Sequence, residues 1–219
     1  MVMSTFPVTV IDNFLDDIDE VLNIAKSVEY TEPGYNYYPG SISKKKLHEI
    51  DNVLNNKLMA KLSLIFWDLN DSFVSWDSSR IDFMKLKPLA TKDNILNVGM
   101  IHHDNEEYTD VSGILYLNRS SQKDCGTSFY DCKVKNYKFT EELTDVVKKF
   151  HGGDEVPNLV KTLQSHFNCF DETIRVQNKF NRLCVYSPDV WHGVTNYGEE
   201  NRYTMRIFAS YKNRSPLQR

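Results

Sequence analysis

The sequence predicts a fold that is mainly β (α+β): helices come first, followed by an all-β sandwich or barrel that a helical insertion interrupts. Three observations predict it. Before residue 80, apolar side chains recur at helical spacing; after it, short β-like runs alternate with turn signals; and one segment among those runs has a complete helix pattern. Short strands separated by turns are typical of a sandwich or barrel rather than of a parallel α/β sheet.

Length and composition indicate a single globular domain. The chain has 219 residues, of which 41% are hydrophobic and 26% are charged, and this is the profile of an ordinary folded protein. We expect one domain over residues 1–219. Within it, we expect an N-terminal strand and supporting helices in residues 1–79, the β core in residues 80–211, and the helical insertion in residues 131–171.

The charge balance and the lack of targeting signals exclude several classes of protein. The 26 Lys and Arg residues against 30 Asp and Glu residues give a net charge of −4, so nucleic acid is not an expected partner. No apolar run approaches the roughly 20 residues that span a bilayer, and residues 1–10 do not resemble a signal peptide. The four cysteines form no CxxC pair. We therefore expect reduced thiols and a cytoplasmic protein, in the host cell cytoplasm if the source is a virus.

The N-terminal part predicts one strand, two helices and a loop. A strand is expected at residues 6–11. The apolar residues of the helix that follows have helical spacing: Ile18, Val21, Leu22, Ala25 and Val28. Residues 31–43, rich in Gly, Pro and Tyr, predict a loop. Residues 45–69 predict a second helix, because apolar residues recur there every three or four positions.

The C-terminal part predicts seven strands and two inserted helices. The strands are expected at residues 81–86, 97–103, 112–117, 127–130, 173–176, 182–187 and 202–211. Thr140 begins a helix that Gly152-Gly153 end, and a second helix is expected at about residues 154–167. Because the insertion separates two strands of the core, we expect it to shape substrate access or a dimer contact.

Three residues near predicted strands could bind a metal ion. His102 and Asp104 are two positions apart after a predicted strand, so they face the same side of an extended backbone while His103 faces away. His192 follows another predicted strand. Two histidines and one carboxylate form the facial triad of non-haem iron sites, which leaves the other coordination positions open.

The last predicted strand carries two arginines on one face. Arg202, Thr204 and Arg206 alternate with residues of the opposite face. A guanidinium group can bind a carboxylate through two parallel hydrogen bonds, and such charge-assisted pairs are strong and directional. This face therefore predicts a site for a carboxylate ligand.

The order of these residues along the chain resembles that in the iron(II)- and 2-oxoglutarate-dependent dioxygenases, in particular their prolyl-4-hydroxylase-like branch. The match consists of the HxD motif at residues 102–104, the distal His192, and Arg202 ten residues beyond it, followed by x-Thr. Residues 113–118 (GILYLN) look like the family's strand after the HxD motif, and residues 126–130 (GTSFY) support the match.

The resemblance covers about residues 81–210 and implies a fold, a cofactor and an activity. The implied fold is a double-stranded β-helix, the jelly-roll or cupin-like barrel. The implied Fe(II) ligands are His102, Asp104 and His192, and the implied 2-oxoglutarate contacts are Arg202, Thr204 and Tyr116. With O2 as second cosubstrate and ascorbate as a candidate reductant, the implied reaction hydroxylates a C–H bond of a peptidyl (prolyl included) or small-molecule substrate and releases succinate and CO2.

The residues alone leave alternatives open. The same three ligands suit a catalytic zinc ion, His103 is a rival for His102, Arg206 is a rival for Arg202, and Tyr116 could be a core residue only. The alternative functions are a cupin-type metal enzyme (an isomerase or hydrolase) that does not use 2-oxoglutarate, and a non-catalytic binding module. We expect a monomer or a homodimer.

The remaining polar residues are interpreted as structural. His48, His151 and His166 are expected at the surface or at helix ends. Cys184 is expected in the core. Residues 178–182 are expected to form a hairpin turn, with a substrate role for Arg182 left open.

Overall fold

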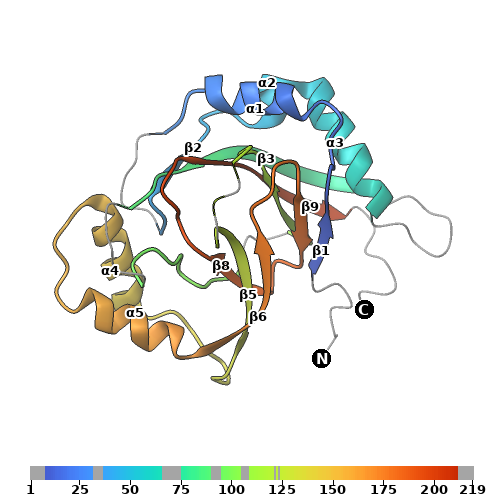
Figure 1. Cartoon of the computed structure of the whole chain (residues 1–219). Helices are drawn as coiled ribbons and strands as arrows, with labels where there is room; N and C mark the ends of the chain where they lie inside the picture. The colour runs from blue at the N-terminus through green and yellow to red at the C-terminus, as the bar shows by residue number, and fades with distance from the viewer. Residues whose placement is uncertain are drawn as a thin grey trace.

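The chain folds into two antiparallel sheets that face each other, with helices on the outside (Figure 1). The computed structural model describes residues 8–31, 37–65, 75–89, 95–104, 109–120, 122 and 124–211. The larger sheet has the strand order β1-β7-β4-β9-β3-β2 and the smaller one the order β6-β5-β8. The strands are β1 Val8–Ile11, β2 Gly40–Ile42, β3 Trp76–Leu86, β4 Val111–Tyr116, β5 Gly126–Cys132, β6 Phe170–Gln177, β7 Leu183–Tyr186, β8 Trp191–Val194 and β9 Arg202–Tyr211.

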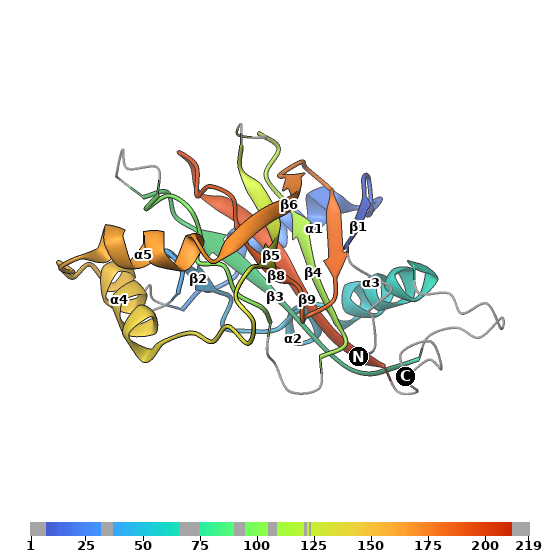
Figure 2. The same ribbon diagram turned by 90° about the horizontal axis from the view of Figure 1, so that it is seen from below.

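Five helices lie around these sheets in the described part of the chain. They are α1 Ile18–Ser27, α2 Leu47–Ile50, α3 Asn52–Ile65, α4 Glu141–Gly152 and α5 Leu159–Phe167. Helices α1 to α3 cover the outer face of the larger sheet, and α4 and α5 lie together at the opposite end of the molecule from α3 (Figures 1 and 2). None of these helices is both long and apolar enough to cross a membrane.

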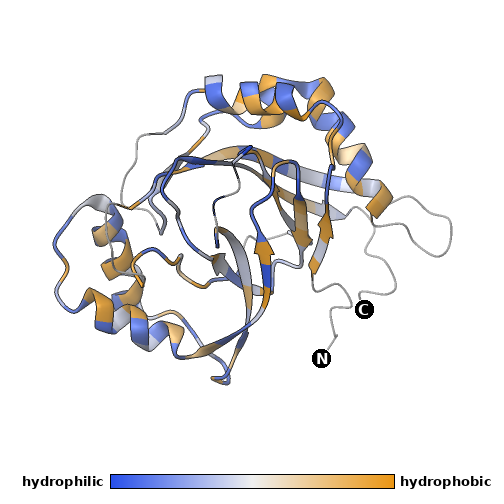
Figure 3. Cartoon of the chain, in the orientation of Figure 1, coloured by the Kyte–Doolittle hydropathy of each residue, from blue (hydrophilic) through white to orange (hydrophobic). Residues whose placement is uncertain are grey.

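Alternation along the strands separates a core from a cavity. On β9, Met205 and Ile207 are buried against helices α1 to α3, together with apolar residues of β3, β4 and β7. Arg202, Thr204 and Arg206 face the opposite side, toward the smaller sheet. Figure 3 shows hydrophobic and hydrophilic residues alternating along the helices that cover the sheets. The prediction that these three residues share one face is therefore confirmed.

The helix expected over residues 45–69 is two helices. It breaks at Asp51, whose carboxylate accepts a hydrogen bond from the backbone N–H of Leu54 at 2.9 Å and so caps the start of α3. Helix α3 is described as far as Ile65; residues 66–69 lie outside the described residues, as do residues 6–7 of the first expected strand. The loop expected at residues 31–43 contains the short strand β2, which pairs with β3.

The helical insertion has the expected ends for its first helix. The Thr140 hydroxyl accepts a hydrogen bond from the Leu143 N–H at 3.1 Å, and Gly153 ends α4 in the left-handed conformation at φ 96°. The second helix begins at Leu159 rather than near residue 154. Apolar residues of both helices pack against Met100, so the insertion is joined to the core through the segment that precedes His102.

His166 lies in the last turn of α5, at a helix end as expected, but it is buried rather than at the surface. Only 3% of it is exposed, its Nδ1 lies 2.7 Å from the Tyr137 hydroxyl, and its Nε2 has no partner. Burial lowers the pKa of this imidazole to about 4, because the charged form is disfavoured away from water. Helical spacing did not reveal this, because aromatic residues outside the helix cover the ring, among them Tyr137 and Phe139 from the start of the insertion.

The buried His166 should make the protein less stable in mild acid. Its pKa is lower in the folded chain (about 4) than in the unfolded chain (6.5), so between these pH values only the unfolded chain takes up the proton. As the pH is lowered through this window, the free energy of unfolding should therefore decrease, by up to about 1.4 kcal/mol per pH unit for this group. Urea unfolding at several pH values measures the free energy of unfolding of the parent and of His166→Gln. The variant should show a smaller slope of this free energy against pH, and equal slopes would contradict the prediction.

Residues 178–182 do not form the expected hairpin turn. They carry the chain from β6 in the smaller sheet to β7 in the larger one. Arg182 donates to the Asp12 carboxylate from Nε at 2.6 Å and from Nη2 at 3.0 Å, and it does not line the cavity between the sheets. The structure therefore gives Arg182 a role in joining the connection between β6 and β7 to the N-terminal segment.

Candidate metal and cosubstrate site

The three predicted metal ligands meet at one point. Nitrogen atoms of His102 and His192 and a carboxylate oxygen of Asp104 lie within 4.8 Å of one another. The Nε2 atoms of His102 and His192 are 3.9 Å and 3.5 Å from Asp104 oxygens. His103 is not part of this group: its ring packs against that of Trp191 at an interplanar angle of 51°, with ring centroids 4.2 Å apart. The geometry thus favours His102 over its rival.

Backbone pairing brings these ligands together. The N–H of each of His102 and His192 donates to the carbonyl of the other at 2.8 Å, so the two side chains project on the same side. The Asp104 N–H donates to the Pro188 carbonyl at 2.9 Å, which fixes the carboxylate beside them. His192 follows β7 as expected, but it lies within a further strand, β8, which the sequence analysis did not predict.

The strand expected at residues 97–103 is absent; the structure has a single bridge, between His102 and His192. Two glycines explain how the segment still approaches β8 closely. A Cβ on Gly99 would lie 2.7 Å from the Val194 Cβ, and one on Gly193 would lie 3.1 Å from the Met100 carbonyl oxygen. Glycine is required where two backbones come this close, and the tight contact replaces a regular ladder.

Each histidine has only one ring nitrogen available for a metal ion. The Nδ1 atoms of His102 and His192 are each 2.9 Å from a backbone carbonyl, of Met100 and Val190 respectively. With a proton on Nδ1 donated to that carbonyl, Nε2 keeps its lone pair and points at Asp104. Burial lowers the pKa of His192 to about 4, so this ring is neutral at physiological pH, as metal binding requires.

Asp104 is ionised and partly unsatisfied. Burial opposes its ionisation, but the favourable electrostatic interactions with His192, His102 and Arg206 together outweigh burial and keep the pKa of Asp104 below its ordinary value. Its Oδ2 is buried with no hydrogen-bond partner. A buried carboxylate oxygen without a partner is costly unless a cation is bound there. Two imidazoles and this carboxylate therefore fit a divalent iron or zinc ion.

Tyr186 was not predicted from the sequence, yet it contacts this group. Its hydroxyl lies 3.1 Å from the His192 Nε2, and burial raises the pKa of the phenol well above its ordinary value. The hydroxyl thus remains protonated and donates to the lone pair that a metal ion would use. Its signal in the sequence is weak, because a tyrosine on a barrel strand is more often a core residue.

Replacing Tyr186 by phenylalanine should have opposite effects on the protein with and without metal. The metal-free variant should lose about 1 kcal/mol of unfolding free energy, the typical net value of one hydrogen bond. Its affinity for Co(II) should rise, because the lone pair of His192 is no longer occupied. Urea unfolding and a Co(II) absorption titration measure the two effects. A fall in both would show that the hydroxyl supports the metal site instead.

The ligands open into a cavity of about 510 Å³ between the two sheets. Its walls come from β3, β4, β9 and the smaller sheet, and the insertion contributes Phe139 and Thr144. Tyr37, which also lines the cavity, lies under the ammonium group of Lys148 of α4, 4.7 Å from its ring centroid. The insertion therefore forms part of the cavity wall.

Arg202 lies deep in this cavity with unused donors. Its guanidinium is buried, its Nη1 donates to the Gly126 carbonyl at 3.3 Å, and its Nε has no partner. No described carboxylate lies within ion-pair distance of it. Burial lowers the pKa of Arg202 from its ordinary value, although a guanidinium remains charged. A buried cation of this kind lacks an anion, and a dicarboxylate such as 2-oxoglutarate supplies one.

The other two predicted cosubstrate contacts are placed differently. Thr204 is buried and lines the cavity. Tyr116 is fully buried behind the lining, and its hydroxyl donates to the Thr127 Oγ1 at 2.7 Å. Thr127 itself lines the cavity, so it is a further hydroxyl beside Arg202 that the sequence analysis missed. The direct cosubstrate role predicted for Tyr116 stays a prediction.

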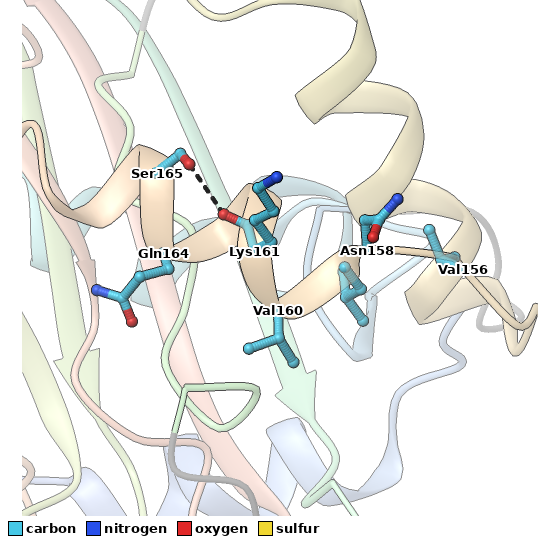
Figure 4. Close-up of a pocket in the computed structure, with 7 residues that line it drawn as sticks. Val156, Asn158, Val160, Lys161, Gln164 and Ser165 are labelled. Atoms are coloured by element: carbon cyan, nitrogen blue, oxygen red, sulfur yellow. Dashed lines mark hydrogen bonds between the residues drawn. The ribbon is translucent and has the colours of Figure 1, made fainter.

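A second hollow, on the outer side of the insertion, has no comparable chemistry. It has a volume of about 710 Å³ and is lined by Val156, Asn158, Lys161, Gln164 and Ser165, among others (Figure 4). The Ser165 hydroxyl donates to the backbone carbonyl of Lys161 at 3.0 Å. No titratable cluster converges there, so the cavity between the sheets is the candidate site.

Comparison with solved structures identifies the fold as that of the 2-oxoglutarate- and iron(II)-dependent oxygenases. A prolyl-4-hydroxylase from Pseudomonas putida matches with a TM-score of 0.53 and 14% identity over 96% of each chain. HygX from Streptomyces hygroscopicus, solved with nickel, 2-oxoglutarate and hygromycin B, matches with a TM-score of 0.55 and 11% identity over 95% of this chain and 85% of its own. A prolyl hydroxylase from Trichoplax adhaerens, in complex with a hypoxia-inducible-factor peptide, matches with a TM-score of 0.52 and 13% identity over 95% of this chain and 85% of its own.

The chain belongs to DUF6445, a family of unknown function, whose model matches residues 2–195. A comparison with curated proteins gave no match. The predicted double-stranded β-helix is confirmed by the likeness to the solved oxygenases, and the residues of the HxD motif and the distal histidine form a candidate metal site within it.

Proposed function

We propose that this protein is an Fe(II)- and 2-oxoglutarate-dependent dioxygenase that hydroxylates a C–H bond of a peptidyl, including prolyl, or small-molecule substrate. The observation that carries the proposal is the convergence of His102, Asp104 and His192 in a cavity that also holds the buried, unpaired Arg202. Two of the similar structures, a prolyl-4-hydroxylase and HygX with hygromycin B bound, support the peptidyl and the small-molecule class respectively.

The chain's own residues have definite tasks in this reaction. His102, Asp104 and His192 would hold the metal ion, with the two imidazoles oriented by backbone carbonyls. Arg202 would bind the distal carboxylate of 2-oxoglutarate, and the walls of the cavity would exclude water. Bound iron supplies the oxidising chemistry, in which one O2 and one 2-oxoglutarate give the hydroxylated product, succinate and CO2.

Anaerobic titration with Fe(II) and 2-oxoglutarate tests the proposal directly. We expect a metal-to-ligand charge-transfer absorption band that requires both components, and succinate release once O2 is admitted. A His103→Ala variant is the matched control, because His103 neighbours the ligands but is not one of them. Absence of the band in protein that binds a divalent metal would favour a cupin-type enzyme that does not use 2-oxoglutarate.

A further inference from the structure

The cavity contains a second arginine, Arg206, which the tasks above do not use. Arg206 and Arg202 face the cavity from the same strand, β9, with Thr204 between them. Four residues of extended strand separate their backbones by about 13 Å. Arg206 lies within electrostatic range of Asp104, whereas Arg202 contacts Gly126. One 2-oxoglutarate with its distal carboxylate on Arg202 therefore does not also occupy Arg206.

Arg206 is held rigidly by a buried carboxylate. Asp82 is fully buried on the neighbouring strand and is the direct cross-strand partner of Arg206. The Nε and Nη2 atoms of Arg206 are each 2.8 Å from the Asp82 Oδ1. A guanidinium fixed in this way loses little further freedom when it binds a ligand.

Arg206 is not needed to neutralise Asp82. The Lys46 ammonium and the Arg80 Nε lie 3.1 Å and 3.6 Å from the Asp82 Oδ2, so three cations surround the single carboxylate. Neither Lys46 nor Arg80 lines the cavity, whereas Arg206 does, with 17% of its side chain exposed. The surplus positive charge therefore faces the cavity, where an anionic group can meet it.

The wall beside Arg206 is aromatic. Its guanidinium carbon is 5.5 Å from the ring centroid of Phe208, and both Phe208 and Tyr38 line the cavity. A rigid cation next to apolar ring faces favours a ligand that joins an anionic group to an apolar or ring-bearing body.

We propose that Arg206 binds an anionic oxygen group, a carboxylate or a phosphate, of the substrate, so that the substrate of this enzyme is an acid. The chemical step rests on the proposed function above, but the binding step does not. Arg206 thus selects the substrate, and Arg202 holds the cosubstrate.

Calorimetric titration with simple aromatic probes tests this binding site. Benzoate and phenyl phosphate carry the two candidate anionic groups, and benzamide is the neutral match for benzoate. The titrations use the full chain saturated with Zn(II) and 2-oxoglutarate, so that Arg202 is occupied. We expect at least one acid to bind roughly tenfold more tightly than benzamide; the stronger acid distinguishes a carboxylate substrate from a phosphate substrate. Equal binding of all three probes would overturn the proposal.

Three variants separate ligand binding from a purely structural role of Arg206. Arg206→Gln, and the double variant Asp82→Asn with Arg206→Gln that removes both charges, should lose the preference for the acid. Asp82→Asn alone should keep the preference for the acid, because Arg206 keeps its charge and an amide oxygen can still accept its hydrogen bond. Arg182→Gln is the matched control, since this arginine pairs with Asp12 away from the cavity. A folded double variant that binds the acid as the parent does would overturn the proposal.

The same titration on metal-free protein distinguishes failure of this inference from failure of the proposed function. If zinc and 2-oxoglutarate do not bind, the proposed function fails, but the effect of Arg206→Gln on benzoate or phenyl phosphate binding is still measurable. If both bind and no acid is preferred, the inference fails while the proposed function stands.

Discussion

Replacing Asp104 by alanine should abolish tight metal binding. Asp104 supplies the only described carboxylate of the three-residue group, and its buried Oδ2 has no other partner. Loss of an outer-shell partner of a metal ligand costs roughly 10- to 100-fold in affinity, and loss of the ligand itself should exceed this. Competition titration with Co(II) or Fe(II) under anaerobic conditions measures the change.

Two controls make the result specific to the site. Asp189→Ala removes an exposed carboxylate three residues before His192, and His103→Ala removes an imidazole that packs against Trp191. Both variants should bind metal as the parent does. Parent-like affinity in Asp104→Ala, or loss of affinity in Asp189→Ala, would show that the metal site lies elsewhere.

Replacing Arg202 by methionine should remove 2-oxoglutarate binding without loss of stability. Removing one partner of a buried hydrogen-bonded charge pair costs about 2–5 kcal/mol, so affinity should fall by at least roughly 30-fold. Without cosubstrate, however, Arg202 is a buried cation with no described carboxylate partner. An apolar side chain of similar length avoids the cost of burying that charge, so the melting temperature of the ligand-free variant should stay equal or rise.

The two readouts together exclude a structural role for this arginine. Protection against thermal unfolding by 2-oxoglutarate should be seen in the parent and lost in Arg202→Met. Arg202→Lys should recover part of the affinity, because it restores the charge but not the two parallel donors. A lower melting temperature with unchanged 2-oxoglutarate affinity would instead make Arg202 part of the scaffold.

The sequence by itself predicted what depends on local spacing. Period-two alternation placed Arg202, Thr204 and Arg206 on one face of β9, and Thr140 and Gly153 marked the ends of α4. These features depend on backbone geometry within a few residues, so they can be predicted without knowing which other segments pack against them. The same spacing placed His102 and Asp104 on one side, although the backbone there is not a regular strand.

Only the tertiary structure decided features that depend on contacts between different elements. The burial of His166 beside Tyr137 and the contact of the Tyr186 hydroxyl in one sheet with His192 in the other are of this kind. The break at Asp51 is a local cap, which the apolar periodicity did not reveal. The roles of the two arginines were separated in the same way. Both are arginines on the same face of β9, but Arg206 forms an ion pair with the buried Asp82, whereas Arg202 pairs with no described carboxylate. Charge pairing is a property of the folded neighbourhood, and this is why the sequence left their assignment open.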